Sequence, residues 1–228
     1  MHLETTPNHL IMVPGHATFK GDIIEFPADP YADDPWILQP FQAGEPPFYI
    51  EHIQGGIDLL VQDPSHSLLM FSGGLTRNGT HWREADTYNA IAEYLLQQQG
   101  LQHLAGQLAI EGFARDSFEN VDFSRRRFVQ LFGSYPLRMT VVGWDFKEKR
   151  FRLHANALEV RNFAYYSRNH LTGDAREAAV QGEVQTIEDY IKYPHGEGGK
   201  PHRVRLERNL SPEPIPYPGV PELTSVAA

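Results

Sequence analysis

Four continuous apolar runs divide the first two thirds of the chain, and three of them lead directly into glycine-containing loops. They cover residues 10–13, 67–71, 107–110 and 139–142, of which the third is the weakest. Strands that are apolar throughout, instead of alternating, are typical of a parallel sheet covered on both faces. We therefore expect these runs to form four buried strands of one sheet.

Helical spacing of apolar residues fills the intervals between these runs. Spacings of three and four predict helices over residues 48–61 and 88–95, a third starting at Asp116, a fourth around residues 151–158, and a further helix over residues 175–191. Alternating strands and helices predict an α/β class: a three-layer Rossmann-like fold with a mainly parallel sheet and helices on both faces.

The remaining segments set the expected domain organisation. Residues 1–194 are predicted to form a single domain, with a proline-rich insertion or lid at 20–47 that lacks any sustained period. Residues 195–228 are rich in glycine, proline and arginine, and are predicted to form an extended C-terminal tail.

Composition narrows the classes of function. The chain has no cysteine, which excludes disulfides, thiolate metal sites and a cysteine nucleophile. Its net charge of -9 argues against nucleic acid and anionic membranes as partners, since both are bound by clustered basic residues. No leader is evident, and no apolar run reaches the roughly 18 residues of a spanning helix, so the expected location is the cytoplasm.

The loops after the four strands are the expected place for a ligand. In an open parallel sheet, ligands bind beyond the carboxyl ends of the strands, where glycine lets backbone N–H groups approach a polar group. No Walker, dinucleotide-binding or hydrolase-elbow motif occurs there. The candidate ligand-binding residues are Gly15, His16, Ser72, Gly73, Gly74, Arg77, Arg115, Asp116, Ser117, Asn120, Asp145, Lys147 and Arg150.

Two carboxylates are candidates for catalysis or for holding a metal, namely Glu84 and Glu111. In the 111–120 segment, Asp116 or Ser117 also fits the role of a helix cap that Glu119 completes. The eleven histidines show no metal-binding spacing, and only His16 is placed as a site residue. His52 is expected to pack on its helix or face solvent, and the other histidines are expected on the surface.

The order of these residues resembles domain-of-unknown-function family 218 (DUF218), the SanA/ElyC/YdcF-like proteins, and its fungal-type members most of all. The resemblance runs from Leu10 to Leu158. It consists of the glycine after the first strand, the Ser-Gly-Gly loop at residues 72–74, Glu84-Ala85, and a series at Glu111, Ala114, Ser117 and Glu119-Asn120. Ala114 replaces the usual hydroxyl residue, and Lys147 stands where bacterial members have histidine before the arginine that Arg150 matches.

This resemblance implies a Rossmann-like fold and associates the family with S-adenosylmethionine, without fixing a reaction. The leading hypothesis is an enzyme, either a hydrolase or a transferase, that acts on a polar, phosphorylated or nucleotide-like small molecule. The alternatives are a non-catalytic nucleotide- or S-adenosylmethionine-binding module and an interaction scaffold. S-adenosylmethionine and a divalent metal both stay open as cofactors, and the pattern fixes no oligomeric state.

Overall fold

We describe the protein from a computed structural model that covers residues 6–20, 29–169 and 171–220. Its centre is a sheet of five parallel strands in the order β5-β4-β1-β6-β7. In chain order these strands are β1 (His9–Pro14), β4 (Ser67–Ser72), β5 (Leu108–Glu111), β6 (Arg138–Trp144) and β7 (Phe163–Asn169). The fold is α/β and Rossmann-like, as the apolar runs predict, and the strand order reverses between β1 and β6.

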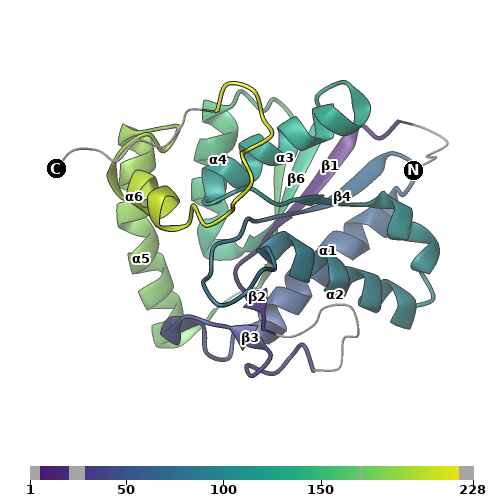
Figure 1. Cartoon of the computed structure of the whole chain (residues 1–228), viewed down its shortest axis with the longest axis horizontal. Coiled ribbons are helices and arrows are strands. Elements are labelled where there is room, and N and C mark those ends of the chain that lie inside the picture. The colour runs from purple at the N-terminus through teal and green to yellow at the C-terminus, as the bar shows by residue number, and fades with distance from the viewer. Residues whose placement is uncertain (1–5, 21–28, 170, 221–228) are drawn as a thin grey trace.

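Helices cover both faces of this sheet (Figure 1). They are α1 (Pro46–Gln62), α2 (Glu84–Gln98), α3 (Ser117–Phe132), α4 (Glu148–Ala157), α5 (Gly173–Lys192) and α6 (Gly199–Glu207). Ile11 and Val13 of β1 belong to the core shared with α1 and α2, whereas Leu10 and Met12 belong to the core shared with α3 and α4. The same strand therefore fills two cores, which is why its sequence is apolar throughout.

The fifth strand, β7, has no counterpart among the four predicted runs. It lies at the edge of the sheet and pairs in parallel with β6. Its sequence, FAYYSRN, includes serine, arginine and asparagine, and most of its residues are only half-buried. An edge strand tolerates such polar positions, so the pattern of a fully buried strand is missing.

The 20–47 segment contains short regular elements that the sequence does not predict. β3 (Trp36–Ile37) pairs antiparallel with β2 (Thr18–Phe19), while residues 21–28 lie outside the described part of the chain. Trp36 is buried, its ring centroid lies 4.7 Å from that of Phe19, and its indole N–H donates to the Pro30 carbonyl at 2.9 Å. This part of the segment is thus fixed to the core by aromatic packing.

The expectation of an extended C-terminal tail is wrong for its first half. α6 forms there and packs on α5 at one side of the molecule (Figure 1). Between α6 and residue 220 the described chain has no regular secondary structure. It runs back along α3, where Arg126 and Gln130 donate to the Pro218 and Pro216 carbonyls at 2.7 and 3.0 Å. The helix depends on contacts with distant residues, which a local pattern does not reveal.

Candidate functional site

A cavity of about 860 Å³ opens at the carboxyl ends of the strands. Its walls include Gly15 after β1, Arg77 in the loop after β4, and Trp144 at the end of β6. α5 and α6 supply the outer wall. The cavity therefore lies at the point where strand order reverses, the usual ligand site of such sheets, and its volume suits a small molecule.

The glycines after β1 and β4 give α2 room to approach the sheet. A Cβ atom on Gly15 would lie 2.5 Å from the Cβ of Glu84, and one on Gly73 would lie 2.9 Å from it. The N–H groups of Gly15, Gly73 and Gly74 donate to the carbonyls of Ser72, Glu111 and Ala114 at 2.7–3.0 Å. These glycines therefore shape the site, and their N–H groups already have partners within the fold.

Adding one methyl group at Gly15 tests this packing. We expect Gly15→Ala to lower the free energy of unfolding by about 1–3 kcal/mol, because the rigid start of α2 must move. The measurement is urea unfolding followed by circular dichroism. Gly106→Ala is the control, since Gly106 has a negative φ and its Cβ would meet no atom within 4 Å. Equal stability of the two variants would contradict this account of Gly15.

Glu84 lines the cavity from the first turn of α2. The residue is 6% exposed, and its carboxylate accepts a hydrogen bond from the Thr76 hydroxyl. The backbone N–H of Glu84 donates to the Gly74 carbonyl at 3.1 Å, which ties the helix start to the loop after β4. The sequence-predicted carboxylate is thus at the site, held in place on both sides.

Glu111 lies outside the cavity lining, and so do Ser72, Gly73 and Gly74. The Glu111 carboxylate accepts from the Ser72 hydroxyl at 2.6 Å, the Phe113 N–H at 2.8 Å and the Tyr217 hydroxyl at 3.2 Å. Burial raises its pKa to about 7, against the effect of these hydrogen bonds. Glu111 therefore anchors the floor beside the cavity and links it to the C-terminal segment.

The other polar residues of the loop after β5 line the cavity but are paired within the protein. Arg115 forms a buried ion pair with Glu119 at 2.6 Å, and Asn120 donates to the Ser72 carbonyl at 3.0 Å. Asp116 caps α3 by accepting from the Glu119 N–H at 2.9 Å, as the sequence predicts. Glu119 closes the turn by accepting from the Arg115 N–H, one residue before the cap.

Asp116 also forms an ion pair with a basic residue of the C-terminal segment. Arg205 of α6 donates to it at 2.6 Å, and both side chains are at least 90% buried. Burial alone would raise the pKa of Asp116, but the ion pair with Arg205 holds it below its ordinary value. α6 is therefore part of the site, joined to it by a buried charge pair.

Basic groups with spare hydrogen-bonding capacity face the cavity. Burial, together with the charge of Arg150, lowers the pKa of Lys147 to about 8. Arg150 pairs with Glu183 of α5 at 3.2 Å, and the Nε atoms of Arg77 and Arg150 are buried without a hydrogen-bond partner among the described residues. Arg208, at the end of α6, adds a further cation to the lining.

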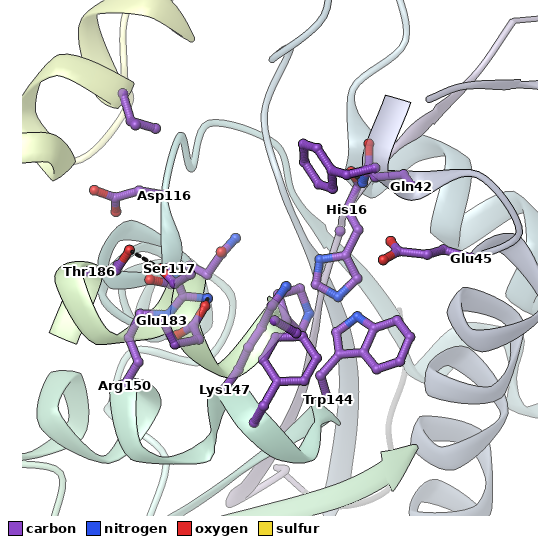
Figure 2. A pocket seen from close by; sticks show the side chains of 18 of the residues that line it. His16, Gln42, Glu45, Asp116, Ser117, Trp144, Lys147, Arg150, Glu183 and Thr186 are labelled. Atoms are coloured by element: carbon purple, nitrogen blue, oxygen red, sulfur yellow. Dashed lines mark hydrogen bonds and ion pairs between the residues drawn. The ribbon is translucent and has the colours of Figure 1, made fainter. Parts of the chain in front are cut away.

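The opposite part of the cavity is aromatic (Figure 2). Burial and the nearby Lys147 lower the pKa of His16 well below its ordinary value, so the imidazole is neutral. The His16 ring lies 5.5 Å from that of Tyr49, and Trp144 lies on the same side. Phe41, Phe48 and Phe146 complete this wall, which offers rings to an apolar or aromatic part of a ligand.

Asp145 is the remaining sequence-predicted site residue, and it is turned away from this cavity. Its carboxylate forms an ion pair with Arg176 of α5. It lines instead a small open depression beside α4. The sequence places Asp145 in the correct loop, directly after β6, but does not reveal that its side chain is outside the cavity lining.

Several residues at the cavity carry no sign of a site role in the sequence, namely Lys200 and Arg208 of the C-terminal segment and His154, the partner of Ser117. His154 was expected on the surface but is fully buried in α4, and its Nε2 lies 2.8 Å from the Ser117 hydroxyl oxygen. His9 is buried as well, between the Ser67 and Thr140 hydroxyls. A histidine spaced among apolar helix positions, as His154 is between Phe151 and Leu158, is the signal that could have revealed this burial.

Two searches of the described ranges found nothing. No group of three or more histidine, aspartate or glutamate side chains there is arranged to hold a metal ion. In the same ranges, none of the helices combines the length and apolar character that crossing a bilayer requires.

Comparison with known proteins finds a yeast protein of similar sequence. The chain is 26% identical over 192 residues to "Uncharacterized protein YOR238W" of Saccharomyces cerevisiae. The alignment covers 66% of this chain and 63% of that protein, so the chain spans less than two thirds of its relative's length. No family model matches the chain, and no solved structure matches it.

Proposed function

We propose that this protein is an enzyme that binds a phosphorylated, nucleotide-like small molecule in the cavity at the β1–β6 switch point. One observation carries the proposal, namely that the charge of the cavity is opposite to that of the chain. The protein as a whole has a net charge of -9. Four acidic side chains line the cavity against six basic ones: Arg77, Arg115, Lys147, Arg150, Lys200 and Arg208.

The partners of these groups support an anion over a cation as the ligand. Arg115 is satisfied by Glu119, but Arg77 and Arg150 each keep a buried Nε donor without a partner in the described residues. Partially buried guanidinium donors are the groups that bind phosphate oxygens with good geometry. A phosphoryl group bound beside Lys147 and Arg150 would offset the mutual repulsion of these two cations.

The two-sided lining supports the nucleotide-like part of the proposal. Lys147 lies between the polar side, with Arg150 and Ser117, and the aromatic side, with His16 and Trp144 (Figure 2). A ligand with a phosphate at one end and a flat ring at the other would use both. S-adenosylmethionine, in contrast, carries a sulfonium cation, which the basic lining disfavours.

Ligand-induced stabilisation tests the proposal. At 100 times its dissociation constant, a ligand that binds only the folded state raises the free energy of unfolding by about 2.7 kcal/mol. We expect thermal shifts with inorganic phosphate and larger ones with nucleoside monophosphates, but none with S-adenosylmethionine. Absence of any shift with the phosphorylated compounds, or a shift with S-adenosylmethionine alone, would overturn the proposal.

A pair of lysine variants locates the binding. Lys147→Met is expected to weaken nucleoside monophosphate binding by about tenfold or more, because a desolvated charge contact contributes over 1 kcal/mol. Lys149→Met is the matched control, since Lys149 is exposed, two residues away, and does not line the cavity. Titration calorimetry of both variants at one salt concentration gives the comparison. Equal losses in both would place the anion elsewhere.

A further inference from the structure

The Ser117–His154 pair has the geometry of an activated nucleophile. Ser117 is the first residue of α3, is half-buried and lines the cavity. Its Oγ lies 2.8 Å from His154 Nε2, within the distance at which an imidazole accepts a hydroxyl proton. The two residues come from different helices and are 37 positions apart.

The surroundings of His154 favour its neutral form. The ring is fully buried and packs against Tyr190, with centroids 4.3 Å apart, and against Phe118 and Phe151. Burial and the charge of Arg150 lower its pKa to about 3, whereas Asp116 acts in the opposite direction. A neutral imidazole has one ring nitrogen free to accept a proton, and Asp116 is the carboxylate whose charge would stabilise the imidazolium that forms.

Tyr190 lies beside the same pair. A side-chain hydrogen bond with Ser117 acts to lower the pKa of its phenol, but burial has the larger effect and holds this pKa well above the ordinary value. Arg150, which acts on the same histidine, brings a cation to this side of the cavity.

We propose that Ser117 is the nucleophile of a phosphoryl transfer, with His154 as general base. The inference rests on the proposed function, because it takes the phosphoryl group of the bound ligand as the electrophile. Ser117 Oγ forms a bond to phosphorus while the ester P–O bond breaks, and the Ser117 proton passes through His154 to the leaving oxygen. Water then attacks phosphorus, the Ser117 Oγ–P bond breaks, and a proton returns to serine, releasing inorganic phosphate.

Fluorophosphonate labelling of the full chain tests the pair. In this reaction Ser117 Oγ displaces fluoride from phosphorus and His154 takes the serine proton, leaving a stable adduct that peptide mass spectrometry locates. We expect labelling of Ser117 and its loss in Ser117→Ala. Ser65 is an internal control, since its Oγ lies 3.2 Å from His66 Nδ1 on the exposed surface, outside the cavity. No adduct on Ser117, or equal labelling of Ser65, would overturn the inference.

Two histidine variants keep the test decisive. His154→Phe retains a ring among Tyr190, Phe118 and Phe151, and His154→Gln retains a hydrogen-bonding group, so at least one is expected to fold. We expect each folded variant to label about 100-fold or more slowly, the usual contribution of a general base. An unchanged labelling rate in a variant with wild-type melting temperature would show that His154 is not the base.

The thermal shift with phosphorylated compounds distinguishes failure of the proposed ligand from failure of the proposed nucleophile. If nucleoside monophosphates stabilise the protein but Ser117 is not labelled, the nucleophile fails and phosphate binding stands. If Ser117 is labelled through His154 without any stabilisation by phosphorylated compounds, the proposed ligand class fails and the activated serine stands.

Discussion

Replacing Arg205 with leucine is expected to lower the free energy of unfolding by about 3–5 kcal/mol, the usual cost of removing one partner from a buried ion pair. Arg205 Nε donates to Asp116 at 2.6 Å and lies 3.4 Å from Glu119. Without it, the Asp116 carboxylate would be desolvated beside a second carboxylate. Urea unfolding at neutral pH measures the loss.

Two further variants test whether the lost charge of Arg205 causes this loss of stability. Arg203→Leu changes an exposed residue of the same helix and is expected to alter stability by less than about 0.5 kcal/mol. Adding Asp116→Asn to Arg205→Leu should recover part of the loss, because asparagine removes the charge and still caps α3. An additive double variant would point instead to lost packing by the Arg205 side chain.

Glu111 is expected to make stability fall as pH rises toward and through neutrality. Burial raises its pKa in the fold from an ordinary value of 4.5 to about 7, so folding favours the protonated acid. The stability from this group is complete below about pH 4.5 and is lost as pH rises through about 7, a change of about 3 kcal/mol by linkage.

Glu111→Gln isolates this contribution. Glutamine can keep an acceptor toward Phe113 and Tyr217 while presenting N–H groups to the Ser72 hydroxyl. We expect the variant to gain stability over the wild type by about 3 kcal/mol between pH 4.5 and pH 8. Urea unfolding across this range is the measurement, with Glu207→Gln, at an exposed residue, as the control. A constant difference between variant and wild type would mean that Glu111 titrates normally.

The sequence predicts the fold best for strands whose two faces are both covered by helices. Residues 10–13, for example, are apolar at every position because β1 contributes to two cores. The periodicity of the helices shows where the loops between helices and strands lie. Because ligands bind where the strand order reverses, the loops that carry Gly15, Arg77 and Lys147 are expected at one cavity, and all three residues line it. This much follows from local pattern and topology.

The rest of the site depends on side-chain direction and on distant segments. Ser72 and Glu111 are paired residues at the ends of β4 and β5, and Asn120 of α3 donates to Ser72, so their polar groups turn toward that helix. The loop position alone does not give this direction. The Ser117–His154 contact joins two helices, and no spacing along the chain encodes it.

Because the C-terminal segment contacts the loop after β5, that loop gains its last partners only at the end of synthesis. Asp116, Arg115 and Glu111 are made early, but their partners Arg205, Arg208 and Tyr217 follow 89, 93 and 106 residues later. All five strands of the central sheet also precede these partners in the chain. The cavity can therefore be completed only after every residue of the sheet has been made, because α6 and Arg208 come later.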